Sequence, residues 1–267
     1  MTRLVSFGDS WTFGVGLSWE PGMTQEEYQI TKKDIDITNK YSFRGLLAKE
    51  FGLENINFAV GGSSNQRQLR YAHEFEFKSG DIVLWGITST ARNEIWNDRR
   101  KIYQSYFLQH ARTCQEDTAL DNKSDKTISG DLCKHIKMTV KSFYSPDEEV
   151  RRLYHRIKHW NDYFKLKGIK VLWYDTLNHH NYESNPENML YTDEKYRDLL
   201  SRLCKVNGFT RLDDKYHFSW SRGFRDCGRI EWLSENSLAN PFSGHPTKKG
   251  HRQLADMVRP FVTSCLR

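Results

Sequence analysis

Residues 4–12 of the chain read LVSFGDSWT, a short apolar run that ends at Phe7 and passes directly into Gly8-Asp9-Ser10. Such a run is typical of a buried strand in a parallel sheet. The turn that follows it opens at the carboxyl end of the strand, where open α/β sheets bind ligands. Ser10 is therefore a candidate nucleophile, because its hydroxyl and its own N–H would face the same site. The competing interpretation is that Asp9 and Ser10 only cap a turn.

Three further apolar runs, at residues 56–59, 82–85 and 169–174, also predict buried strands. Helical periodicity separates them at residues 41–51, 65–75 and 149–166. We expect two more helices at 192–206 and 247–266, and a fifth strand near 209–212. The alternation of strands and helices predicts an α/β fold with a parallel sheet of about five strands.

The 267 residues contain no internal repeat and no Pro- or Gly-rich linker, which favours a single domain over residues 1–267. The polar stretch from about 94 to 148 is too long for a simple crossover. We interpret it as an insertion that is partly helical, and we expect it to cap the domain together with residues 15–40.

The composition of the chain argues against several classes of protein, among them nucleic-acid-binding and membrane-spanning proteins. The net charge of +6 is spread over many segments, so nucleic-acid binding is not expected. No stretch approaches roughly 18 apolar residues, and the N-terminus lacks an apolar signal core, so we predict neither a membrane span nor a signal peptide. The five cysteines form no C-x-x-C pair, which favours a reducing compartment such as the cytoplasm. The oligomeric state stays open.

Three other segments follow predicted strands or precede the last helix. The glycine pair Gly61-Gly62 would either present N–H groups to an anion or simply make a tight turn. Residues 86–93 offer hydroxyl and amide groups at the same edge of the sheet. Near the C-terminus, Pro246 would hold His245 in an extended conformation, and Thr247 would cap the final helix. The adjacent His179 and His180 lack a carboxylate partner nearby, so we predict no metal and no other cofactor.

These blocks resemble those of the SGNH, or GDSL-type, hydrolases, a flavodoxin-like three-layer family of esterases, lipases and deacetylases with helices on both faces of the sheet. The resemblance implies that Ser10 is the nucleophile and His245 the general base. It also implies an oxyanion hole made by the N–H groups of Ser10 and Gly62, with Thr88 at the position of the side-chain donor.

Two positions depart from the family pattern. Thr88 stands where the family has asparagine, and Arg92 or Asn93 is the alternative donor. Phe242 stands where the family has the aspartate that orients the histidine. A Ser10–His245 dyad is then expected, with Asp214 and Asp226 as candidates for a third member.

The resemblance implies a carboxylic ester hydrolase, and we predict a small acyl group, acetyl first, carried on a carbohydrate. The reason is the aromatic residues of the loops, which offer flat surfaces for sugar rings: Trp11, Trp19, Trp96 and Trp220. The alternative is a glycan-binding protein of the same fold that has lost part or all of its catalytic activity.

Overall fold

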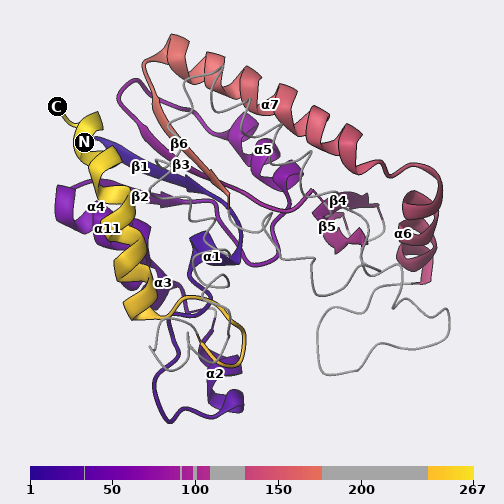
Figure 1. The fold of residues 1–267 in the computed structure, drawn as a ribbon, viewed down its shortest axis with the longest axis horizontal. Helices are drawn as coiled ribbons and strands as arrows, with labels where there is room; N and C mark the ends of the chain where they lie inside the picture. Colours follow the sequence, from indigo (N-terminus) through magenta and orange to yellow (C-terminus); the bar gives the residue numbers. More distant parts are fainter. Residues whose placement is uncertain (33, 91, 99–100, 109–129, 176–239) are drawn as a thin grey trace.

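The computed structural model describes the chain except for residues 33, 91, 99–100, 109–129 and 176–239 (Figure 1). Its centre is a four-stranded parallel sheet in the order β2-β1-β3-β6. The strands are β1 (Arg3–Phe7), β2 (Glu54–Asn57), β3 (Ile82–Ile87) and β6 (Lys170–Asp175). The predicted parallel α/β sheet is confirmed. The helix predicted at 192–206 and the strand predicted near 209–212 lie outside the described residues.

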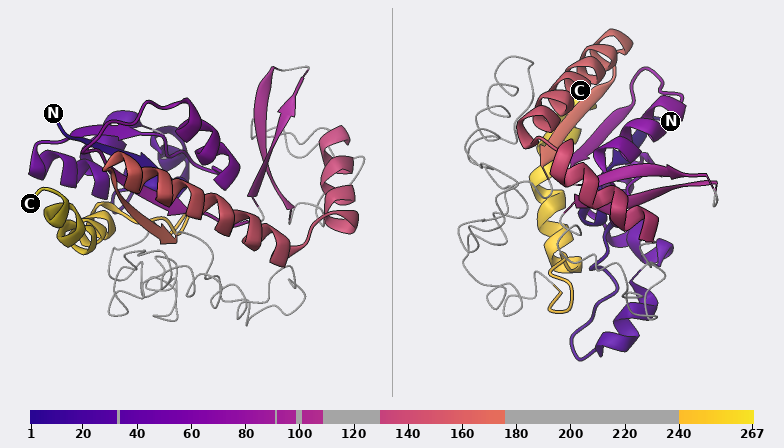
Figure 2. Two further views of the ribbon diagram at one scale, coloured as in Figure 1. Left: turned by 90° about the horizontal axis from the view of Figure 1, so that it is seen from above. Right: turned by 90° about the vertical axis from the view of Figure 1, so that its right-hand side faces the viewer.

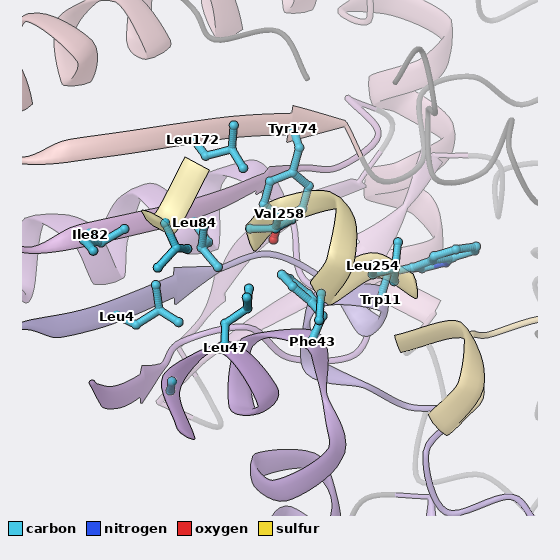
Figure 3. Close-up of a cluster of buried hydrophobic side chains, with 13 residues drawn as sticks. Leu4, Trp11, Phe43, Leu47, Ile82, Leu84, Leu172, Tyr174, Leu254 and Val258 are labelled. Atoms are coloured by element: carbon cyan, nitrogen blue, oxygen red, sulfur yellow. The ribbon is translucent and has the colours of Figure 1, made fainter. Parts of the chain in front are cut away.

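One face of the sheet is covered by α4 (Phe43–Phe51) and α11 (Lys248–Cys265), and α3 (Ile35–Tyr41) packs against these two helices. Figure 3 shows how aliphatic side chains of β1, β3 and β6 meet those of α4 and α11, with Phe43 and Tyr174 edge to face between the layers. The helix predicted over residues 41–51 is α4, and α3 is a separate helix that ends at Tyr41. Ser42 ends α3 and caps α4, and its hydroxyl accepts a hydrogen bond from the N–H of Gly45.

The opposite face carries α5 (Asn65–Glu74) and α7 (Pro146–Lys167) over a core rich in aromatic rings. Trp85 stacks on Phe7 and on Trp173, with centroid distances of 4.6 and 4.8 Å. Trp160 and Phe164 of α7 complete this cluster. Much of the aromatic content of the chain is therefore core filling, which composition alone could not distinguish from a ligand platform.

The predicted insertion at about 94–148 contains a hairpin as well as the expected helix. Strands β4 (Arg92–Asn97) and β5 (Ile102–Phe107) pair in antiparallel fashion, and α6 is Gly130–Ser142. Figure 2 shows the hairpin extending away from the parallel sheet. Two short helices, α1 (Ser10–Phe13) and α2 (Gln25–Thr31), follow β1 in the chain. In the described part of the chain, no helix combines the length and the apolarity that a membrane crossing needs.

Candidate active site

Ser10 begins helix α1 immediately after strand β1. The preceding residue, Asp9, caps this helix, because its Oδ1 accepts a hydrogen bond from the N–H of Trp11 at 3.0 Å. Gly14 ends the helix with φ of +101°, a conformation that glycine adopts without steric cost. The single helical turn therefore holds Ser10 at the carboxyl edge of the sheet, where it is 7% exposed.

His245 lies directly opposite Ser10, although 235 residues separate them in the chain. Its Nε2 is 2.8 Å from the Oγ of Ser10, which is hydrogen-bonding distance. The loop that carries it is closed by Asn240, whose carbonyl accepts from Gly244 N–H and whose N–H donates to the His245 carbonyl, both at 2.8 Å. Thr247 then caps α11 as expected, accepting from the N–H of Gly250.

The electrostatic surroundings keep the His245 imidazole neutral. Burial lowers its pKa to about 4, and the charges of Arg92 and Lys32 act in the same direction. The Asp9 carboxylate and the backbone of Ser243 oppose this and raise the pKa. At neutral pH the ring can therefore accept a proton from Ser10, but it is a weaker base than an ordinary histidine.

No side chain among the described residues accepts a hydrogen bond from the second ring nitrogen of His245, Nδ1, and a hydrogen bond to the Ser243 backbone is a contact that raises the pKa of this ring. In a complete triad a carboxylate accepts the Nδ1 proton and so selects the tautomer that leaves Nε2 free to act as a base. Phe242, at the position three residues earlier, instead packs on the ring of Tyr28 at a centroid distance of 5.9 Å. Asp214 and Asp226, the two candidates for a third member, lie outside the described residues.

Two backbone N–H groups near Ser10 are available to an oxyanion. In the described structure, neither the N–H of Ser10 nor that of Gly62 donates to another backbone group. Gly62 has φ of +77°, and its neighbour Gly61 lies against the serine, since a Cβ added there would be 4.0 Å from the Ser10 Cβ. The turn after β2 thus approaches the nucleophile closely, as an oxyanion hole requires.

Thr88 has a different set of contacts from the one the resemblance implied. Its hydroxyl donates to Asp9 Oδ2 at 2.8 Å, and its backbone pairs with the side-chain amide of Asn65. A hydroxyl has one proton to donate, so this bond occupies it. Of the alternative donors, Arg92 Nη1 lies 3.3 Å from Asp9 Oδ2, whereas the bond of Asn93 with Gln66 uses the acceptor Oδ1 of Asn93 and not its Nδ2 donor. Asp9 is fully buried and is the acceptor that organises this edge of the site.

A crystal structure of phospholipase A1 from Streptomyces albidoflavus NA297 superposes with a TM-score of 0.50 at 14% identity, over 97% of this chain and 98% of that one. The parallel sheet and its helical layers correspond to one architecture. The chain has the SGNH hydrolase fold.

Other solved structures align over similar lengths. A lipolytic protein of the G-D-S-L family from Desulfitobacterium hafniense DCB-2 shares 14% identity over 97% of this chain and 98% of its own, with a TM-score of 0.48. An acetyl xylan esterase, AlAXEase, shares 12% identity over 97% and 99%, also with a TM-score of 0.48. The sequence matches no protein-family model and no curated protein. The likeness at these identities concerns the SGNH fold and not the activity.

Three residues that position the site escaped prediction from the sequence. Tyr28 is fully buried, and its hydroxyl donates to the carbonyl of Val15 and lies 2.9 Å from the hydroxyl of Ser243, which ties α2 to the histidine loop. Asn240 closes that loop. Gly16 lies so close to the loop that an added Cβ would be 2.3 Å from the carbonyl oxygen of Pro246. Tyr28 and Gly16 carry no local sequence signal, because their contacts with the histidine loop join segments more than 200 residues apart. Asn240 acts locally, through hydrogen bonds with Phe242, Gly244 and His245.

The remaining sequence predictions concern metal ligands and exposed aromatic side chains. Within the described ranges, no group of three or more His, Cys, Asp or Glu side chains could hold a metal ion. His179, His180 and Trp220 lie outside those ranges. Trp11 is 5% exposed and packs beside the His245 ring at a centroid distance of 6.2 Å, whereas Trp96 is 46% exposed on the hairpin.

Proposed function

We propose that the chain is a serine esterase that removes a small acyl group, acetyl in the first instance, from a hydroxyl of a carbohydrate. The observation that carries this proposal is the 2.8 Å separation between Ser10 Oγ and His245 Nε2 at the carboxyl edge of an SGNH-type sheet. A nucleophile and a base within hydrogen-bond reach are the minimum arrangement for covalent acyl transfer.

In the proposed reaction, Ser10 Oγ attacks the carbonyl carbon of the ester while His245 Nε2 accepts the serine proton. The negative charge on the carbonyl oxygen is stabilised by the N–H groups of Ser10 and Gly62. The bond to the alcohol then breaks, and the imidazolium gives its proton to the departing oxygen. Water attacks the resulting acyl-serine with His245 again as base, which releases the carboxylic acid and restores the Ser10 hydroxyl.

The electrostatics favour a slow enzyme with a neutral base. The low pKa of His245 means that the imidazole is unprotonated across neutral pH, but it also weakens proton abstraction. The negative charge of Asp9 raises the pKa of His245 and so stabilises the imidazolium that forms in the transition state. It does not replace a carboxylate acceptor on Nδ1, the removal of which from a full triad costs about ten-thousand-fold in rate.

The preference for a small acyl group follows from the confinement of Ser10. The residue is 7% exposed, and the neighbouring Trp11 is 5% exposed. A short acyl chain can approach the hydroxyl with little displacement of this packing, whereas a long chain needs an apolar channel.

Hydrolysis of p-nitrophenyl acetate by the wild type, Ser10→Ala and His245→Ala tests the proposal. We expect turnover by the wild type and loss of activity in both variants. Ser6→Ala is a matched control, because Ser6 is also buried and lies four residues earlier in β1. His251→Asn is the control for the histidine, since asparagine can keep the acceptor that His251 Nδ1 offers to the N–H of Phe43. Equal rates in all five proteins would refute the esterase proposal.

A second candidate function is a glycan-binding protein with an SGNH fold and little or no catalysis. The lack of a carboxylate on Nδ1 of His245 in the described structure favours it. A serine-directed fluorophosphonate separates the two candidates. Stoichiometric labelling of Ser10, absent in Ser10→Ala, supports the esterase, and the absence of labelling in the wild type supports the binding protein.

A further inference from the structure

The β4–β5 hairpin has two faces with different neighbours. In a strand, alternate side chains point to opposite faces, and the register pairs Glu94 with Ser105 and Trp96 with Tyr103. The other face carries Ile95 and Tyr106, which pack against α6 in a separate hydrophobic cluster. The face that carries Arg92, Glu94 and Trp96 is therefore turned away from that cluster.

The inner end of this face reaches the candidate active site. Arg92 is the first residue of β4, and its guanidinium lies 3.3 Å from the carboxylate of Asp9, the neighbour of Ser10. One step along the same face, Glu94 forms an ion pair with Arg70 of α5 at 3.0 Å. The Glu94 side chain is 4% exposed and that of Arg70 is 22% exposed, so this contact fixes the hairpin to the body of the domain.

The outer end of the same face carries an exposed aromatic pair. Trp96 and Tyr103 are 46% and 45% exposed, and their ring centroids are 5.1 Å apart in an edge-on arrangement. The Arg70 guanidinium lies over the Tyr103 ring, 4.1 Å from its centroid. Trp96 lies four residues beyond Arg92, which places it about 13 Å farther along the strand.

These properties fit a sugar ring better than a protein partner. A pyranose has an apolar face of C–H groups and a polar rim, and the aromatic pair is bordered by polar groups, namely Arg70 and the ion pair of Asp98 with Lys101. A stable protein interface buries at least roughly 1,200 Å², much more than two half-exposed rings offer. Two aromatic side chains are sufficient to hold one ring of a carbohydrate chain.

We propose that Trp96 and Tyr103 form a remote subsite that binds a sugar ring of an extended carbohydrate, while the acylated ring lies at Ser10. This inference rests on the proposed function for its catalytic part, but the binding itself does not require catalysis. The substrate class that follows is an acetylated polysaccharide or long oligosaccharide rather than an acetylated monosaccharide.

Binding is tested in Ser10→Ala, which cannot turn over the ligand. Xylohexaose is titrated by isothermal calorimetry, and Trp96→Ala in this background is expected to raise Kd about tenfold. Trp96→Phe keeps a ring and should retain most of the affinity. Ile102→Ala is the matched control, because Ile102 is 48% exposed at the same end of the hairpin but belongs to the opposite face. Equal Kd values for Trp96→Ala and Ile102→Ala would overturn the subsite.

Kinetics separate failure of the subsite from failure of the esterase. On acetylated xylan, Trp96→Ala is expected to lower kcat/KM about tenfold through KM, with no change on p-nitrophenyl acetate. Activity on p-nitrophenyl acetate with an unchanged KM on xylan refutes the subsite alone. No activity on either substrate refutes the proposed function, and the titration still decides the subsite. A wild-type dimer that Trp96→Ala dissociates in sedimentation would show that a second copy covers this face, which also overturns the proposal.

Discussion

Substitution Gly16→Ala perturbs the active site without touching a reacting group. An added Cβ would be 2.3 Å from the carbonyl oxygen of Pro246 and 2.7 Å from that of His245. Ordinary contact between such atoms needs more than 3 Å, so the loop must withdraw by roughly 1 Å. The Ser10–His245 distance of 2.8 Å would then exceed hydrogen-bond reach. We expect kcat to fall about a hundredfold, and the overpacked contact to cost about 1–3 kcal/mol of stability.

The assay is hydrolysis of p-nitrophenyl acetate together with urea denaturation. Gly80→Ala is the matched control, because Gly80 has φ of +84° with no atom near the added Cβ, and it precedes β3 at the edge of the sheet away from Ser10. It should lose about 1–3 kcal/mol of stability through backbone strain and keep its rate. A Gly16→Ala variant that folds and retains the wild-type kcat would refute the claim that the loop contact sets the dyad geometry.

Three further predictions concern charge and pH. The pKa of His245 is about 4 and the neutral ring is the base, so kcat/KM should increase as the pH rises through 4. At pH 5.5 kcat/KM should reach ~97% of its plateau value, whereas a histidine with the ordinary pKa of about 6.5 would give about 9%. Asp9→Asn removes a charge that raises the pKa of His245, so the acid limb of the kcat/KM profile should move to lower pH, and an unmoved limb would contradict this role. The substitution also removes the carboxylate that pairs with Arg92, so urea denaturation should show a loss of about 3 kcal/mol of stability. Burial lowers the pKa of His251 to about 3 in the folded state, so the contribution of this residue to stability is complete above pH 6.5 and is lost as the pH falls from 6.5 toward 3. The urea concentration at the unfolding midpoint should therefore be lower at pH 4.5 than at pH 7, and the difference should be smaller in His251→Asn.

Much of the architecture was predictable because buried parallel strands are continuous apolar runs. The predicted strands at 4–7, 82–85 and 169–174 lie within two residues of β1, β3 and β6 at either end. The strand predicted at 56–59 instead occupies Glu54–Asn57. Asn57 ends it, since its side chain bonds both the N–H and the carbonyl of Ala59 and so turns the chain. The apolar run alone could not reveal that competing local hydrogen bond.

The insertion shows the limit of periodicity. Residues 92–107 carry no strong alternation, because one face of the hairpin is stabilised by polar contacts such as Arg70 with Glu94. The side chains on that face are buried by α5, and the position of α5 depends on how the whole domain packs. A hairpin held in this way has a weak signal in the sequence.

For the site, the sequence by itself determined the residue types and their local geometry. The Gly-Asp-Ser turn, the glycine pair and the Thr247 cap depend on neighbours within a few positions, where backbone sterics and short side-chain hydrogen bonds act directly. Only the tertiary structure decided the contacts between distant segments: the 2.8 Å approach of His245 to Ser10, the use of the Thr88 hydroxyl by Asp9, and the packing of Phe242 on Tyr28. These distances depend on how the sheet, its two helical layers and the loops pack together. The packing is the result of many weak contacts, and no short stretch of the chain specifies them.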